Sequence, residues 1–324
     1  MKKRDVLGLM ALGLALPALA QTEAGFPSRP IRFIVPIAPG SSGDTLTRAV
    51  AEQVRIASGA ATFVENRPGA DLVVGTQNLV ASPADGHSVL LVSTSSMIIN
   101  PLVLKDLPYK VDDLMPLANF VSIPAVVVTA PGSRFKTMAE LLEAARRQPG
   151  SVSVGVYGNS YRLGMLDLAR RAGVQFNIIP YKGAAQAMTD VIGGAVDAAL
   201  TDVGGAAPQV AGGKVRALAV AAEKRQVALP GVPTVAESGV PGYTLNVFIG
   251  FAVHAKTPAP VSAKLEAMLL KAMAQPELRD LVQKQTGAEV AGTPRQEFAA
   301  MVAGESRRLQ ELVKLAGPEL GAAR

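Results

Sequence analysis

The sequence predicts an α/β protein of two lobes, with a hinge and a central ligand cleft. Strand-like and helix-like segments alternate along most of the 324 residues, which favours parallel sheets covered by helices on both faces. Both halves of the chain contain a strand, a loop of small polar residues and a helix, in that order. An apolar segment at 245–254 then leads back from the second half. We therefore expect residues 26–125 and 247–324 in the first lobe and residues 126–246 in the second.

The elements of the first half follow from apolar runs and helical periodicity. Residues 29–39 form the first expected strand, and the helix at 44–57 places apolar side chains on one face. A strand at 61–66 and a helix at 72–81 come next. A turn then leads into a short apolar strand that ends in a polar tip, "STSS". The β-branched run at 123–131 is the last strand of this half.

The second half begins with a capping box, in which Thr137 and Glu140 open a helix that Pro149 and Gly150 close. The expected strands and their connections are 151–160, 174–183, 196–201, 213–222 and 245–254, with helices at 161–172 and 184–192 and a short helix and turn at 233–243. The C-terminal third is rich in helix. Its expected helices are 262–274, one that follows Pro276, and a long one from Thr293 to about Gly317 with Pro294 at its first position.

The N-terminus has the pattern of a secretory signal peptide. Three basic residues precede an apolar run that is too short to span a bilayer, and the small residues Ala18 and Ala20 mark a cleavage site. We expect residues 1–20 to be removed and the protein to be periplasmic; an uncleaved membrane anchor is the alternative. The chain has no cysteine, so it has no disulfide and no lipid anchor at the cut.

Composition excludes several classes of ligand. The net charge of +6 falls to +4 without the leader, whose three bases and one acid contribute the difference, and the basic residues are scattered. Nucleic acid is therefore not an expected partner. Aromatic residues make up 4% and tryptophan is absent, which argues against a site that stacks sugars or bases.

The loop "GSSGD" lies between the first strand and its helix, and comprises Gly40, Ser41, Ser42, Gly43 and Asp44. Ligands of open α/β sheets bind beyond the carboxyl ends of the strands, where a helix presents free N–H groups and the positive end of its dipole. The loop therefore suits an anion, although an ordinary strand-to-helix turn explains it equally well. It lacks the lysine of a P-loop, the GxGxxG pattern and the GxSxG elbow.

Three further loops repeat this chemistry. Thr94, Ser95 and Ser96 could offer hydroxyl groups to a carboxylate, or form an ordinary polar loop. In the second half, Asn159 and Ser160 offer neutral donors, and Arg162 offers a guanidinium or points to water. Asp202 follows a strand and could accept backbone amides or contact an amine or hydroxyl of a ligand. Together these loops indicate a solute-binding protein.

Residues suited to catalysis are few. The chain has two histidines: His87 lies in a turn and is expected to be solvated, and His254 ends an apolar strand. No cluster has the spacing of a metal site, and Asp112 and Asp113 are expected to be solvated. We therefore expect no catalytic residue, no metal and no cofactor.

Several segments also resemble a known family. They are "FPSRPIRFIVPIAPGSSGD" (26–44), "VENRPGA" (64–70), "ADGHSVLL" (84–91), "LPYK" (107–110), "PYKGAAQAMTDVIGG" (180–194), "GKVRALAV" (213–220) and "LPGVPTVAESGVPGY" (229–243). Over residues 26–315 the chain resembles the tripartite tricarboxylate transporter receptors, the Bug-type periplasmic solute-binding proteins.

The resemblance implies a two-lobed periplasmic binding protein fold that closes on a small mono-, di- or tricarboxylate. It implies that backbone amides and hydroxyls hold the carboxylate, often through water. The contacts carried over by this resemblance are Gly40 to Asp44, Thr94 to Ser96, Asn159, Ser160, Asp202 and an aromatic at Phe248. The chain departs from the family pattern in two loops. Ser41 and Ser42 replace a glycine pair, and in "VYGNSYRLG" Tyr161 and Arg162 are large and Leu163 replaces a common histidine.

Three functions are compatible with these features. The first is a monomeric receptor that delivers a small organic acid to membrane transporter subunits or reports it to a sensor kinase. The second is an exported enzyme of the same architecture, with Asp44 or Asp202 as its acid–base group. The third is an exported interaction protein whose cleft has degenerated.

Overall fold

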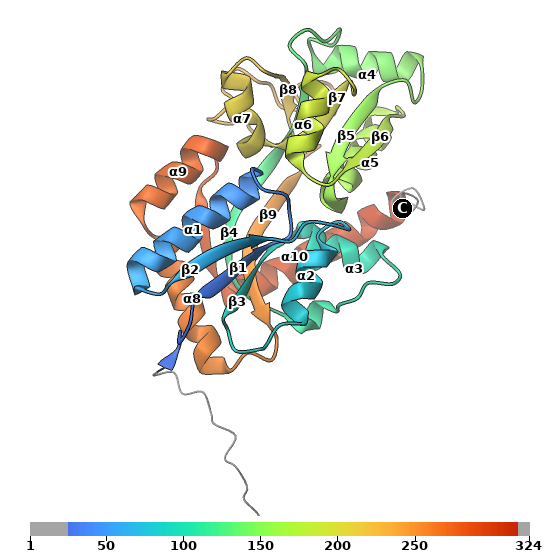
Figure 1. Ribbon diagram of the computed structural model, residues 1–324. Helices are drawn as coiled ribbons and strands as arrows, with labels where there is room; N and C mark the ends of the chain where they lie inside the picture. The colour runs from blue at the N-terminus through green and yellow to red at the C-terminus, as the bar shows by residue number, and fades with distance from the viewer. Residues whose placement is uncertain (1–24, 317–324) are drawn as a thin grey trace, which may run out of the picture.

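The computed structural model describes residues 25–316, which form two lobes around one continuous mixed sheet (Figure 1). The ten strands run in the order β2-β1-β3-β9-β4-β7-β5-β6, and β8 and β10 also pair with β4. The predicted leader, residues 1–20, lies outside the described residues. Within residues 25–316 no helix is both long and apolar enough to cross a membrane.

The first lobe contains the N- and C-terminal elements. Its strands are β1 (Ile31–Val35), β2 (Thr62–Asn66), β3 (Ser88–Ser93), β9 (Asn246–His254) and β10 (Val290–Pro294). Its helices are α1 (Ser42–Ser58), α2 (Val73–Val80), α3 (Asn100–Val103), α8 (Ala259–Met273), α9 (Pro276–Thr286) and α10 (Arg295–Ala316), with the short helical turns η2 (Ser95–Ile99) and η3 (Val111–Asp113).

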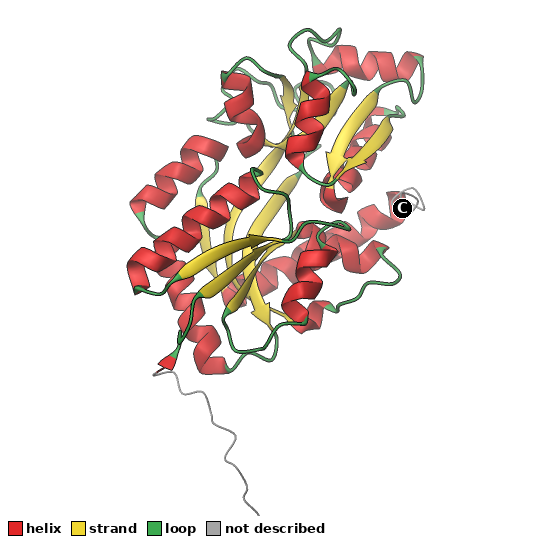
Figure 2. Cartoon of the chain, in the orientation of Figure 1, coloured by secondary structure: helices red, strands yellow, loops and turns green. Residues whose placement is uncertain are grey.

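The second lobe contains the middle of the chain. Its strands are β5 (Ser153–Tyr157), β6 (Asn177–Tyr181), β7 (Ala198–Asp202) and β8 (Arg216–Val220). Its helices are α4 (Met138–Arg147), α5 (Gly158–Ala172), α6 (Ala184–Ile192) and α7 (Val203–Ala211), as Figure 2 shows.

The long strand β4 (Leu114–Thr129) joins the two lobes. Its N-terminal part pairs with β9 as far as Pro124, opposite Asn246, and from Ala125 onward it pairs with β7. The Ala125 amide also donates to the Leu245 carbonyl at 2.9 Å, just before β9 begins. Two neighbouring segments therefore run between the lobes, as a hinge requires.

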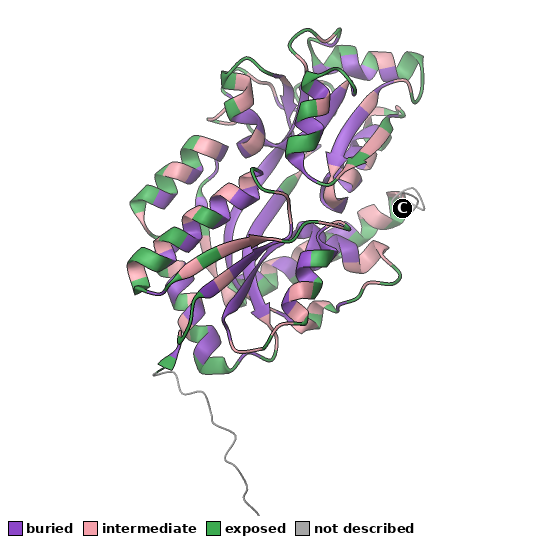
Figure 3. Cartoon of the chain, in the orientation of Figure 1, coloured by how far each residue is buried: buried purple, intermediate pink, exposed green. Residues whose placement is uncertain are grey.

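The side chains of β1 point alternately to the two faces of the sheet, and each face packs against different helices of the first lobe. Phe33 and Val35 pack with α1, α8 and α9, whereas Ile34 packs with α2 and α10 on the opposite face. Successive side chains of a strand point to opposite faces, so a strand covered on both sides is apolar throughout. Figure 3 shows this pattern of burial: the strands are mostly buried, and the outer faces of the helices are exposed.

The structure confirms the alternation of strands and helices but corrects the predicted strand directions. β9 runs antiparallel to β3, and β4 runs antiparallel to β7, β8, β9 and β10. Only β1, β2 and β3 in one lobe, and β5, β6 and β7 in the other, pair in parallel. The antiparallel pairs arise because β4 and β9 carry the chain between lobes in opposite directions.

Several element boundaries also differ from the prediction. Pro294 ends strand β10, which was not predicted, and the last helix begins at Arg295. Helix α7 and the first half of β4 were not predicted either. The segment 233–243 forms turns rather than the expected short helix.

Candidate functional site

A cavity of about 50 Å³ lies between the lobes, at the carboxyl ends of β1, β3, β5 and β7. Hydroxyl groups and one carboxylate form its polar part, and aliphatic side chains form its wall. The polar lining residues are Ser41, Ser42, Ser93, Ser95, Tyr157, Tyr161 and Asp202. The remaining lining residues are Ile37, Gly43, Leu72, Leu91, Ile123, Gly158, Val247 and Ile249. Of the described residues that line it, none is lysine, arginine or histidine.

The N-terminus of α1 opens onto this cavity. Ser41 caps the helix: its hydroxyl accepts a hydrogen bond from the Asp44 amide at 3.3 Å and donates to the Ala38 carbonyl at 3.1 Å. The amides of Ser42 and Gly43 belong to the first turn, whose N–H groups have no partner within a helix. A Cβ atom at Gly43 would lie 2.7 Å from Ile37 Cδ1, so this position takes glycine because the lining is already close-packed.

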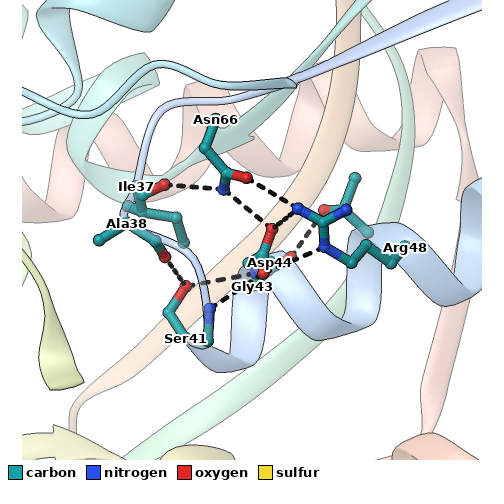
Figure 4. A network of polar contacts seen from close by, with 9 residues as sticks. Ile37, Ala38, Ser41, Gly43, Asp44, Arg48 and Asn66 are labelled. Atoms are coloured by element: carbon teal, nitrogen blue, oxygen red, sulfur yellow. Dashed lines mark hydrogen bonds and ion pairs between the residues drawn. The ribbon is translucent and has the colours of Figure 1, made fainter. Parts of the chain in front are cut away.

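Asp44 holds the loop before α1 together through a network of polar contacts (Figure 4). Its Oδ2 accepts hydrogen bonds from the Gly40 amide at 3.0 Å and from Arg48 Nε at 3.2 Å, and its Oδ1 accepts one from Asn66 at 2.8 Å. Burial alone would raise the pKa of Asp44, but these hydrogen bonds and the Arg48 charge outweigh burial and lower it. The side chain thus braces the loop rather than facing a ligand.

The second lobe contributes two tyrosines and a carboxylate. Tyr157 ends β5 and is the N-cap residue of α5, and its ring lies 4.5 Å from that of Tyr161, one turn further along. The Tyr157 hydroxyl donates to Asp202 Oδ2 at 2.5 Å. Asp202 caps α7, because its Oδ1 accepts a hydrogen bond from the Gly205 amide at 2.7 Å.

Neutral hydrogen bonds join the lobes beside the cavity. The hydroxyls of Ser95 and Ser160 lie 2.7 Å apart, and Ser95 Oγ also accepts a hydrogen bond from the Ser160 amide at 3.0 Å. The Asn159 side-chain amide donates to Asn100 Oδ1 at 2.9 Å. These contacts hold η2 and α3 of the first lobe against the start of α5, so the structure is that of a closed cleft.

The structure brings five of the thirteen predicted site residues to the cavity: Ser41, Ser42, Gly43, Ser95 and Asp202. It places five others nearby in supporting positions. Gly40 and Asp44 shape the loop before α1, and Asn159 and Ser160 join the lobes. Ser96 Oγ bonds to the backbone of Ser93.

The remaining three predicted residues lie farther from the lining. Thr94 Oγ1 accepts a hydrogen bond from the Phe248 amide at 3.2 Å, which joins the end of β3 to β9. Phe248 is buried, and its ring packs edge-on against Phe298 at 5.4 Å. Arg162 lines a surface groove beside α5 and α10 instead.

A second cavity of about 190 Å³ adjoins the first and shares Ile37, Leu72, Tyr157 and Gly158 with it. Ala70, Asp71 and Leu72, which also line it, have positive φ angles of 45°, 51° and 73°. Three consecutive non-glycine residues in this region represent stored strain, which is typical of functional loops. The strained run directs Leu72 into both cavities and places Asp71 in the outer one, which Lys182 also lines from the end of β6.

The histidines do not take part in either cavity. The prediction that His87 is solvated is wrong: it is 2% exposed, accepts a hydrogen bond from the Ser28 amide at 3.2 Å and packs against Phe26. His254 Nδ1 accepts a hydrogen bond from the Lys256 amide at the end of β9. Within the described residues, no three His, Asp or Glu side chains are grouped so that they could hold a metal ion.

Comparison with known proteins agrees with this architecture. Residues 46–317 match the family described as tripartite tricarboxylate transporter family receptor. A Pseudomonas sp. (strain P51) protein, named UPF0065 protein in tcbD-tcbE intergenic region, is 33% identical over 316 residues, which are 96% of this chain and 94% of that protein.

Two solved structures show the same fold. The periplasmic binding protein BugD superposes with a TM-score of 0.85 and 31% identity, over 90% of this chain and 99% of BugD. MatC from Rhodopseudomonas palustris, solved with bound malate, superposes with a TM-score of 0.83 and 25% identity, over 89% of this chain and 99% of MatC. The chain is therefore a member of the tripartite tricarboxylate transporter receptor family, with the two-lobed fold of the Bug-type periplasmic binding proteins.

Proposed function

We propose that this protein is a periplasmic receptor that binds a small organic carboxylate in the closed cleft. The observation that carries the proposal is the convergence of the N-termini of α1 and α5 on a cavity lined by serine hydroxyls and free of basic side chains. Helix N-termini bind anions through free amides and the helix dipole, and need no lysine or arginine to do so. Ser41, Ser42, Gly43, Ser95, Tyr157, Tyr161 and Asp202 are the proposed ligand contacts.

The relatives support the ligand class and the cellular role. MatC is a member of the same fold group and was solved with malate, a small carboxylate. We infer that this chain, as a monomer, delivers its ligand to the membrane subunits of a tripartite transporter or reports it to a sensor kinase. We also infer a hinge at the lobe boundaries near residues 125/126 and 246/247, where β4 changes partners.

We infer a binding protein rather than an enzyme. Of the two acid–base candidates, Asp44 is held by Gly40, Arg48 and Asn66, and Asp202 already accepts hydrogen bonds from Tyr157 and Gly205. Among the described residues, neither carboxylate is hydrogen-bonded to a serine hydroxyl, and the Ser41 hydroxyl beside Asp44 donates to the Ala38 carbonyl instead.

Export is tested by the mass of the protein recovered from the periplasm. Cleavage after Ala20 gives a chain that begins at Gln21. An exported chain that retains Met1 in the membrane fraction would overturn this part of the proposal.

The carboxylate is tested by thermal shift with matched acids, amides and sugars. A ligand at about 100 times its dissociation constant stabilises the folded state by about 2.7 kcal/mol, which raises Tm by roughly 5–10 °C. We expect acids to produce this shift, whereas their amides and the sugars do not. Stabilisation by amides or sugars with none by acids would contradict the proposal.

A pair of glycine variants tests the place of binding. A methyl group at Gly43 points among Ile37, Leu91 and Ile249, which line the cavity, so Gly43→Ala should weaken acid binding at least about tenfold. Gly40→Ala is the control, because a Cβ there meets nothing within 4 Å. With φ at 82°, that variant should cost about 1–2 kcal/mol of stability but keep the acid-induced shift. If both variants weaken acid binding equally, the cavity beside Gly43 is not the place where the acid binds.

A further inference from the structure

The two lobes offer opposite hydrogen-bonding groups to the cavity. From the first lobe, Ser42 and Gly43 at the start of α1 line it, and the amides of this turn have no partner within the helix. From the second lobe, Tyr157 is hydrogen-bonded to Asp202, which is only 2% exposed, and the Tyr161 ring stacks on the Tyr157 ring. The number of donors fixes the direction of the proton between Tyr157 and Asp202.

Each phenol has one proton, and a carboxylate has none to give. Both oxygens of Asp202 accept, one from the Tyr157 hydroxyl and the other from the Gly205 amide. The Tyr157 proton is thereby used.

The Tyr157 proton therefore points toward Asp202. Burial, and after it the charge of Asp202, raises the pKa of both tyrosines far above the usual range, so both keep their protons in neutral solution. What remains at Asp202 for a ligand is the unused lone pairs of its two oxygens. At Asp202, this side of the cavity accepts hydrogen bonds and has no proton to donate.

We propose that the ligand carries a hydrogen-bond donor beside its carboxylate, a hydroxyl or an ammonium group, and that this donor contacts Asp202. The inference rests on the proposed function, because it assumes that the carboxylate binds at the α1 end. Small hydroxy acids and amino acids have both groups. The aliphatic wall formed by residues such as Leu72, Ile123 and Val247 would contact their carbon atoms.

The same chemistry disfavours the closest analogues. An acid with hydrogen in place of the hydroxyl leaves lone pairs of the buried Asp202 without a donor. A keto acid brings an oxygen lone pair against them. A buried hydrogen bond to a charged group contributes about 1.5–3 kcal/mol, so each replacement should weaken binding by about tenfold to a hundredfold.

Calorimetric titration of the purified mature protein tests this with two series of matched ligands. The first series is lactate, alanine, propionate and pyruvate, and the longer one is 2-hydroxyglutarate, glutamate, glutarate and 2-oxoglutarate. In the series that binds, the hydroxy or amino acid should bind at least about tenfold more tightly than both the unsubstituted acid and the keto acid. Equal affinities, or tighter binding of the keto acid, would overturn the inference.

Asp202→Asn tests the residue assignment. The amide brings N–H donors to the accepting side, so the preference for the hydroxy acid over the keto acid should fall at least about tenfold. Asp197→Asn is the matched control: Asp197 immediately precedes the same strand at its other end and accepts from the Ser153 amide and hydroxyl at 2.9 and 2.8 Å. It should keep the wild-type preference, and an equal loss in both variants would contradict the assignment.

Lactamide and propionamide separate this inference from the carboxylate proposal. If amides bind and acids do not, the carboxylate proposal fails, and the donor inference is then judged from the ratio of lactamide to propionamide affinity. If acids bind without regard to the donor, the carboxylate proposal stands and the donor inference fails. Absence of binding by every compound at millimolar concentration would overturn both.

Discussion

At the scale of single residues, the contact between Tyr157 and Asp202 is the most consequential interaction in the cleft. It joins the end of β5 to the end of β7 through side chains at 2.5 Å. Hydrogen bonds to a carboxylate are stronger than those between neutral groups, and a buried carboxylate that loses a donor retains the cost of its desolvation. The contact should therefore contribute to stability as well as to ligand choice.

Removing the hydroxyl tests this contribution. Tyr157→Phe keeps the ring stack with Tyr161 but leaves Asp202 with the Gly205 amide alone, so the free energy of unfolding should fall by about 1.5–3 kcal/mol. Urea unfolding of the ligand-free protein measures it. Tyr181→Phe is the matched control, because Tyr181 donates to Asp190 at 2.6 Å in a more exposed place, where the loss should be about 1 kcal/mol or less. Equal losses would mean that burial adds nothing to the Tyr157 bond.

The residues that could be predicted from the sequence are those whose role is local. Ser41 and Asp44 lie next to the strand and helix that they connect, and their types are typical of a helix start. Tyr157 and Tyr161 were seen in their loop but not as ligand contacts, because their role depends on Asp202, some 40 residues further along. His87 was wrongly expected to be solvated for the same reason, since Phe26 and Ser28 cover it.

At the scale of elements, the start of α1 depends on the charge of Asp44. The pKa of Asp44 is lowered in the folded protein, because the hydrogen bonds and the Arg48 charge outweigh burial. The stability that its ionised form contributes is therefore fully present above the unfolded value near 3.8, and it is lost as the pH falls through the lower folded pKa.

Asp44→Asn should lower Tm at neutral pH, and the difference from wild type should shrink as the pH falls below about 4. Thermal unfolding followed by circular dichroism between pH 2.5 and 7 measures both. Parallel curves over the whole range would show that ionisation of Asp44 does not support the helix start.

Asp71 provides a control of opposite sign. Burial raises its pKa, and the Arg162 charge only partly opposes this. Its ionised form is thus disfavoured by folding, and Asp71→Asn should raise Tm at neutral pH, with a gain that fades as the pH falls through the raised folded pKa and is gone by about pH 4. Asparagine also tolerates the φ of 51° found at this position.

The elements that were predicted well are those with a strong pattern of their own, such as α1 with its apolar face and α4 with its capping box. β10 could not be predicted because Thr293 and Pro294 have the pattern of a helix start, and only pairing with Asn119 and Ala118 of β4 makes them a strand. Strand direction is also a tertiary property. An apolar run has the same composition whether its neighbour is parallel or antiparallel.

At the scale of the whole molecule, the structure is closed, and the closed form depends on small residues where the lobes meet. α7 of the second lobe contacts α9 of the first. A Cβ atom at Gly204 would lie 2.7 Å from Thr286 Cγ2 and 3.3 Å from Ser42 Cβ, both in the first lobe. The adjacent Gly205 differs, because the atoms nearest to a Cβ there belong to Asp202 of its own lobe, at ordinary contact distances of 3.5 Å and more.

A larger side chain at Gly204 should therefore hold the lobes apart. Small-angle X-ray scattering measures this as the radius of gyration. The wild type should show a smaller radius with a saturating acid than without it. Gly204→Val should keep the ligand-free radius and bind the acid more weakly. Gly205→Val places the same side chain one residue further along α7 and should still close. The two variants have the same helix propensity cost, so a difference between them reports on the lobe contact and not on α7 itself. If Gly204→Val contracts like the wild type with bound acid, the α7–α9 contact does not control closure.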